Sequence, residues 1–192
     1  INFFTSQESK TLNDIGIKYI DHLITKDNSK TSFMINGDDE LIKLIEKSIN
    51  AKGKQFIGVM QRNLHSPYEK NYKGREEFVV YDENVIERKE KAINSYDNAM
   101  LYEDYLLSSL ITYIKNSNRS IVLIITADHG QLLGENNLFG HNILEFDTAK
   151  VPFMVYTHNY KLNFDNISIG FHITSLNDIF TKNNFTQFTF IF

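Results

Sequence analysis

Four segments of the chain carry apolar residues at the helical spacing of three or four positions. The longest covers residues 90–116, and its stripe consists of Ile93, Tyr96, Met100, Leu107, Leu110, Ile111 and Ile114. A second helix is predicted between an N-cap at Asp38 and a stop at Gly53, with Leu41, Ile45 and Ile49 on one face. Shorter helices are predicted over residues 12–24 and 174–182.

Compact apolar runs between these segments predict strands. Residues 121–125 form an unbroken run of Ile, Val and Leu, which is typical of a central strand covered on both faces. Residues 55–60 and 151–158 are weaker runs of the same kind, and residues 185–192 are interpreted as an edge strand. The order of helices and strands predicts an α/β fold, with α/β/α layers and a largely parallel central sheet.

Length and charge limit the possible classes of protein. The 192 residues fit a single domain spanning 1–192. A formal charge of -4 with scattered Lys and Arg argues against a nucleic-acid partner. The chain has no Cys, which excludes disulfides and thiolate ligands, so a metal would need His, Asp, Glu or a hydroxyl.

The chain shows no signal peptide and no run of about 18 apolar residues that could cross a bilayer. We therefore expect a soluble chain. Because it begins without Met, we also expect it to be a piece of a longer protein.

An acid and an imidazole follow the predicted central strand directly. Asp128 and His129 provide oxygen and nitrogen donors that suit Zn²⁺ or Mn²⁺, and Gly130 would let the chain turn so that both reach one ion. The alternative is an ordinary strand-to-turn tripeptide in which the Asp side chain caps the turn.

Two more histidines extend this pattern. His65 lies in the polar loop 61–72 after the strand at residues 55–60, and His141 follows a Gly- and Asn-rich loop. In α/β sheets, ligands collect beyond the carboxyl ends of strands, so these rings could converge with Asp128 and His129. Otherwise they are solvated surface residues. The other three histidines have no companion acid and are interpreted as structural or surface residues: His22, His158 and His172.

Four stretches, in this order, resemble the bacterial phosphoethanolamine transferases, which are membrane-anchored members of the alkaline phosphatase and sulfatase superfamily. They are "LHSPYEKNY", "YDNAMLYEDYLLSSLI", "TADHGQLLGENNLFGH" and "VPFMVY", and they lie within residues 55–160. Four blocks in one order are far more specific than any single block. The resemblance implies an alkaline-phosphatase-like fold, here incomplete.

Site residues carry over from the family position by position. The resemblance implies that Asp128 and His129 are zinc ligands. It implies that His65 and His141 are catalytic and substrate-binding residues. They would line the phosphoryl pocket, bind a second metal or hold the phosphate. As imidazolium groups they could stabilise oxyanions. Further matches are Glu135 and Asn136 in the loop before His141, and Tyr96, Asp97 and Asn98 on the long helix, where packing is the expected role.

The activity implied is a double displacement at the periplasmic face of the inner membrane. A threonine attacks the phosphorus of phosphatidylethanolamine, and the resulting phosphothreonine passes phosphoethanolamine to lipid A or another envelope glycan. Zinc, with Mn²⁺ or a second metal as alternatives, would lower the pKa of the threonine hydroxyl and neutralise phosphoryl charge.

The chain also departs from the family pattern. No recognisable nucleophile turn or glutamate ligand precedes residue 55, the membrane helices are absent, Gln131 replaces a glutamate and Ser66 replaces a glycine. We therefore expect the C-terminal part of a catalytic domain that lacks its N-terminal part and membrane anchor, and that is a poor catalyst or inactive alone.

Two other functions remain open at this point. One is a sulfatase or phosphoglycerol transferase of the same superfamily, although the Cys-x-Pro type of sulfatase nucleophile motif is absent. The other is a non-catalytic remnant that binds a partner, or associates with itself, through a bare sheet edge.

Overall fold

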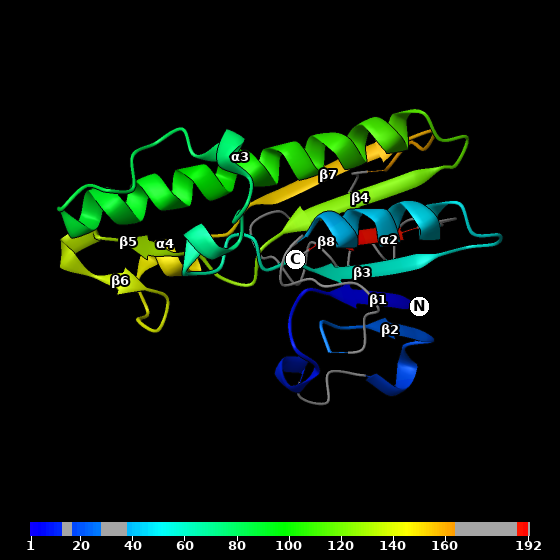
Figure 1. Cartoon of the computed structure of the whole chain (residues 1–192). Helices are drawn as coiled ribbons and strands as arrows, with labels where there is room; N and C mark the ends of the chain where they lie inside the picture. Colours follow the sequence, from blue (N-terminus) through cyan, green and yellow to red (C-terminus); the bar gives the residue numbers. More distant parts are fainter. Residues whose placement is uncertain (13–16, 28–37, 164–187, 192) are drawn as a thin grey trace.

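A six-stranded sheet forms the centre of the computed structural model, which describes residues 1–12, 17–27, 38–163 and 188–191 (Figure 1). Its order is β2-β1-β3-β8-β4-β7. The strands are β1 (Asn2–Thr5), β2 (His22–Ile24), β3 (Phe56–Met60), β4 (Ile121–Thr126), β7 (Phe153–His158) and β8 (Phe188–Ile191). All neighbours pair in parallel except β4 and β7, which confirms the predicted largely parallel sheet.

The last strand of the chain lies in the middle of the sheet. The backbone of β8 pairs with residues 56–59 of β3 on one side and with residues 122–125 of β4 on the other. The prediction of an edge strand at residues 185–192 was therefore wrong. An apolar run indicates a strand, but it does not show which neighbours the strand will have, because those lie far away in sequence.

Two long helices pack next to each other over the sheet. They are α2 (Asp39–Ile49) and α3 (Arg88–Lys115), and both were predicted. Their buried side chains share one core with Phe4, Ile57 and Val59 of the sheet. Helix α2 ends at Ile49 rather than at Gly53, which lies in the turn beyond with a φ of +81° that favours glycine. The predicted helix at residues 174–182 lies outside the described residues.

The buried face of α3 differs from the purely apolar stripe that the sequence predicts. Met100 is 41% exposed, whereas Ala99, Tyr102 and Leu106 are buried. The polar residues Asn98 and Glu103 also face inward. The buried face of α3 is therefore rotated about the helix axis relative to the predicted stripe, because buried polar contacts determine its orientation together with the apolar ones.

Side chains on both faces of β4 are buried, as predicted. Residues Ile121 to Ile124 are each no more than 1% exposed, and alternate side chains of a strand point to opposite faces. This full burial makes β4 a rigid support for the residues that follow its carboxyl end.

The N-terminal segment is where the prediction failed. Residues 17–19 form a single 3₁₀ turn and His22–Ile24 form strand β2, so the helix predicted over residues 12–24 was wrong. Ile17 is 38% exposed, which shows that its helical spacing does not mark a buried face. Pairing with β1, itself not predicted, decides the local structure instead.

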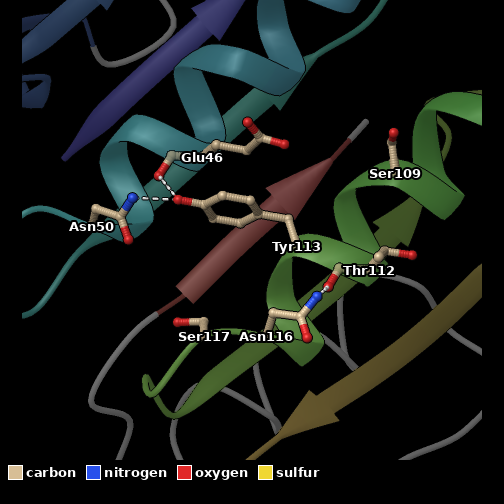
Figure 2. Close-up of a pocket in the computed structure, with 7 residues that line it drawn as sticks. All are labelled: Glu46, Asn50, Ser109, Thr112, Tyr113, Asn116 and Ser117. Atoms are coloured by element: carbon tan, nitrogen blue, oxygen red, sulfur yellow. Dashed lines mark hydrogen bonds between the residues drawn. The ribbon is translucent and has the colours of Figure 1, made fainter.

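A tyrosine ties the two helices together at their C-terminal ends. In Figure 2, the Tyr113 hydroxyl reaches from α3 to α2, where it accepts from Asn50 and donates to the carbonyl of Glu46. The groove around it is lined by residues of α2, α3 and the turns that follow them, and it holds none of the predicted site residues. We interpret this contact as a structural tie.

The remaining elements are short. They are the strands β5 (Leu132–Leu133) and β6 (Phe139–Gly140), the helix α4 (Phe146–Ala149), and the 3₁₀ turns η1 (Ser9–Leu12), η2 (Ile17–Tyr19), η3 (Tyr68–Lys70), η4 (Glu76–Phe78) and η5 (Glu135–Asn137). Within the described residues, no helix combines the length and the apolar character needed to cross a bilayer.

Candidate active site

The carboxyl ends of β3 and β4 bring the predicted site residues to one edge of the sheet. Both strands run parallel to β8, which lies between them, so their following loops leave in the same direction. The loop after β3 carries His65, and the loop after β4 carries Asp128 and His129. Ligand sites of α/β sheets form at such edges.

A small hairpin returns His141 to the same place. Strands β5 and β6 pair antiparallel, with Leu132 opposite Gly140, so the next residues outward are Gln131 and His141. Gln131 Oε1 lies 3.1 Å from His141 Nδ1. The spacing between His129 and His141 is therefore the length of one hairpin, which the sequence alone did not reveal.

Three imidazole rings meet at this edge. The rings of His129 and His141 are stacked with centroids 4.0 Å apart and planes at 24°. The ring of His65 meets His141 edge-on, at 6.0 Å between centroids. The structure thus brings together the histidines that the sequence proposed from two separate strand ends.

All three rings direct Nδ1 to an oxygen. His65 Nδ1 lies 2.5 Å from the Ser66 carbonyl, His129 Nδ1 lies 2.9 Å from the Gly130 carbonyl, and His141 faces Gln131 as described. An oxygen of this kind can only accept, so we assign the proton of each neutral ring to Nδ1. This tautomer leaves Nε2 with its lone pair, as a ligand or base requires.

The donor atoms of Asp128 and His129 lie near each other. Asp128 Oδ1 lies 3.6 Å from His129 Nε2, close to the separation of about 3.4 Å expected for two donors on one tetrahedral zinc ion. Asp128 Oδ1 also accepts from the backbone N–H of His129 at 3.0 Å, so the side chain caps the turn as the alternative interpretation proposed. The two roles are compatible, because a carboxylate oxygen has more than one lone pair.

Two donors are only part of a metal site. Among the residues that the structure describes, no group of three or more His, Asp or Glu side chains is arranged to hold an ion. The side chains of Asp128 and His129 are 77% and 37% exposed, so they face outward, where further ligands could approach.

Burial lowers the pKa of His141, and positive charge on His129 or His65 would lower it further, although Asp128 opposes the shift. The neutral ring is therefore favoured near pH 7. The imidazolium form expected for His141 would need a nearby anion, such as a phosphoryl group, to stabilise it.

Gly130 leaves no room for a side chain. A Cβ built on it would lie 1.9 Å from the carbonyl oxygen of Asp147, and its N–H donates to the carbonyl of Thr148 at 2.8 Å. Its role is thus to let the segment around α4 approach, rather than only to let the chain turn.

A buried polar network holds the loop that carries His65. Asp38, at the N-cap position of α2, does not cap its own helix. It instead accepts from the backbone N–H groups of Arg62 and Asn63 at 3.1 and 2.9 Å. The Asn63 amide in turn donates to Glu103 on α3 at 3.0 Å. Sequence reasoning identified Asp38 only as an N-cap and missed Asn63 and Glu103, because buried polar groups form no periodic pattern.

Burial and the neighbouring charge of Asp38 raise the pKa of Glu103 from 4.5 to about 7. The folded state therefore binds more protons than the unfolded state between these pH values, and stability falls as pH rises through this window. The full shift corresponds to about 3 kcal/mol. Above pH 7 the wild-type chain carries the whole penalty.

Glu103→Gln is expected to raise the free energy of unfolding by about 2 kcal/mol at pH 8. The Gln side chain cannot ionise, which removes the penalty of burying a charge, although Asn63 then donates to a neutral acceptor instead of a charged one. At pH 4.5 the gain should vanish. Denaturant unfolding at both pH values tests this, with exposed Glu69→Gln as the control. A gain that is equal at both pH values would contradict the assignment.

Other residues singled out from the sequence have structural contacts. Asn98 is buried and bonds to both the N–H and the carbonyl of Tyr81, and Tyr96 packs edge-on against Tyr68. Glu135 accepts from Leu133 within the hairpin. His158 bonds to the Ser117 carbonyl. His22 is exposed in β2. Asp97 lies on the predicted helix and Asn136 in the predicted loop, whereas His172 lies outside the described residues.

Comparison with known proteins shows which family the chain resembles. A family model described as Sulfatase matches residues 6–184. Phosphoethanolamine transferase EptA of Helicobacter pylori is 38% identical over 74 residues, which are 36% of this chain and 14% of that protein. EptA of Escherichia coli K12 is 32% identical over 120 residues, or 57% of this chain and 22% of that protein.

A solved structure shares the fold. The C-terminal periplasmic domain of phosphoethanolamine transferase EptC from Campylobacter jejuni aligns with a TM-score of 0.66 at 23% identity, over 82% of this chain and 52% of that chain. The predicted alkaline-phosphatase-like α/β fold and the resemblance to phosphoethanolamine transferases are confirmed. The chain spans 14% and 22% of the two EptA proteins, so their whole activity does not transfer directly.

Proposed function

The chain belongs to the sulfatase family, and on that premise we propose that it forms part of a zinc-dependent phosphoethanolamine transferase. The donor would be phosphatidylethanolamine and the acceptor lipid A or another envelope glycan, with a phosphothreonine intermediate. The location would be the periplasmic face of the inner membrane. The observation that carries the proposal is the meeting of the three imidazole rings beside Asp128.

Asp128 and His129 would hold the zinc ion. Their donor atoms have a suitable separation, and the bond from His129 Nδ1 to Gly130 leaves Nε2 available. When bound, zinc would supply Lewis acidity and neutralise charge on the phosphoryl oxygens. A four-coordinate ion needs further ligands, so we expect weak affinity in this chain alone.

His65 and His141 would form the phosphoryl pocket. Because Nδ1 of each ring is engaged elsewhere, Nε2 is the nitrogen left to face the group, and it can donate to a phosphoryl oxygen once it is protonated. A neutral His141 can accept a proton, and once protonated it would be stabilised by the phosphoryl charge beside it. The pair could therefore bind the group and move a proton at Nε2. A second metal at these rings is the alternative use.

Apolar side chains next to His141 support a lipid substrate. Leu144 is 95% exposed and Phe146 is 77% exposed, and both lie in the segment that follows His141. Exposed apolar side chains that gather into one patch mark interaction sites, and these two lie close together in sequence. The name of one relative agrees: phosphatidylethanolamine transferase Mcr-2 of Escherichia coli is 32% identical over 106 residues, or 50% of this chain and 19% of that protein.

Zinc uptake tests the metal part of the proposal. Elemental analysis at saturating Zn²⁺ should find more zinc in the native chain than in Asp128→Asn or His129→Ala. His158→Ala is the matched control, because that ring bonds to Ser117 outside the candidate site. Equal zinc in the native chain and both site variants would exclude the site.

Mass spectrometry after incubation with phosphatidylethanolamine tests the chemistry. A mass increase by phosphoethanolamine on the protein or an acceptor would support the transferase, and it is expected when a segment that carries the threonine nucleophile is supplied. Transfer of sulfate or phosphoglycerol instead would favour the other members of the superfamily. No transfer in a zinc-loaded complex with that segment would favour a non-catalytic remnant.

A further inference from the structure

We propose that Asn71 is a positioning residue of the candidate active site, because its side-chain amide bridges the backbone carbonyls of Asn63 and His65 and so fixes the His65 ring against His141. The two bonds from Asn71 Nδ2 measure 2.8 and 2.7 Å. The role assigned to His65 rests on the proposed function. The bridge itself is a feature of the loop and can be tested without catalysis.

One end of the bridge is fixed in the core. Asn63 is 2% exposed, and its N–H donates to the Asp38 carboxylate at 2.9 Å. Its amide donates to the Ala99 carbonyl at 3.1 Å and to Glu103 at 3.0 Å. Asn63 is therefore tied to the start of α2 and to the middle of α3, which makes its carbonyl a rigid point of attachment.

The other end of the bridge carries the functional ring. His65 is exposed, so packing does little to set its position. Its backbone N–H donates to the Arg62 carbonyl at 2.9 Å, and its carbonyl accepts from Asn71. An amide –NH₂ has two donors and so suits two carbonyls at once. Asn71 thereby extends the rigidity of the core to the loop around His65.

Asn71 also has a purely local role through its backbone. Its backbone N–H closes the 3₁₀ turn η3 by donating to the Tyr68 carbonyl at 2.9 Å. That bond survives a change of side chain. A side-chain variant therefore tests the bridge and leaves the turn in place.

The first measurement is the contact between the two rings in the chain without ligand. In Asn71→Ala, and in Asn71→Leu, which keeps the number and branching of the side-chain heavy atoms, the nuclear Overhauser effect between the imidazole protons of His65 and His141 should disappear. Asn116→Ala removes a comparable bond, from Asn116 to the Thr112 carbonyl at 3.0 Å, and should leave the contact unchanged. Persistence of the contact in both Asn71 variants would overturn the proposal.

The second measurement is the affinity of the zinc-supplemented chain for inorganic phosphate. Asn71→Ala should weaken binding about fivefold, the equivalent of one ordinary hydrogen bond. In a His65→Ala background it should change nothing, because the ring that it positions is gone. An equal loss in both backgrounds would show general loosening and contradict the positioning role.

The two measurements also separate this inference from the proposed function. If His65→Ala leaves phosphate affinity unchanged, the phosphoryl role of His65 fails. The ring contact then still decides whether Asn71 positions His65. If the contact is lost while phosphate binding depends on His65, both conclusions stand.

Discussion

Removal of residues 188–192 is expected to divide the central sheet and abolish the cooperative fold. Strand β8 pairs with residues 56–59 of β3 and residues 122–125 of β4, and the sheet order places no other strand between them. Two lost ladders cost more than about 5 kcal/mol at roughly 1 kcal/mol per bond. This is comparable to the whole stability of an ordinary domain.

Hydrogen exchange locates the effect. Amides at residues 56–59 and 122–125 should lose protection in the truncated chain, and the thermal transition should broaden or vanish. Thr189→Pro is expected to act in the same direction, because it interrupts the pairing of Thr189 with Ile57 and Leu123. Leu23→Pro in the edge strand β2 is the matched control and should cost less. Unchanged protection after truncation would refute the central position of β8.

Gly130→Ala is expected to destabilise the chain by about 3 kcal/mol and to disturb the site. The added Cβ would lie 1.9 Å from the Asp147 carbonyl oxygen and 2.8 Å from that of Lys150. Because both are backbone atoms, they cannot simply rotate away. Either the segment around α4 or the turn carrying His129 must move, so zinc uptake should fall together with stability.

Gly53→Ala controls for the loss of a glycine. Gly53 has a φ of +81° but open space around it, so its substitution should cost about 1 kcal/mol through backbone strain alone. Chemical denaturation and zinc analysis of both variants check the prediction. A Gly130→Ala chain as stable as Gly53→Ala, with normal zinc uptake, would show that the close approach is not needed.

The sequence predicts those elements whose pattern is long or whose burial is complete. Residues 121–125 are apolar on both faces, and α3 repeats its stripe over many turns, so each pattern leaves few alternatives. The pairings of β2 and β8 could not be predicted in this way. They depend on β1, β3 and β4, which lie far along the chain, and backbone pairing leaves no mark on side-chain spacing.

The candidate site follows the same division. Asp128, His129, His65 and His141 were identified because acids and imidazoles at strand ends suggest chemistry by type. Their supports were not identified, since Asn71, Asn63 and Gln131 are ordinary polar residues until the loops bring them to their partners. Candidate ligands and bases can be predicted from residue type, whereas the residues that position them are revealed only by their contacts in the folded chain.

The three bonds from imidazole Nδ1 have a further consequence. Folding has already selected which nitrogen of each ring faces outward, so an incoming electrophile meets lone pairs without any internal exchange of hydrogen. The rotational entropy of these rings is likewise lost during folding and not at the moment of capture. A cation that binds at this edge therefore meets nitrogen donors whose orientation is already set.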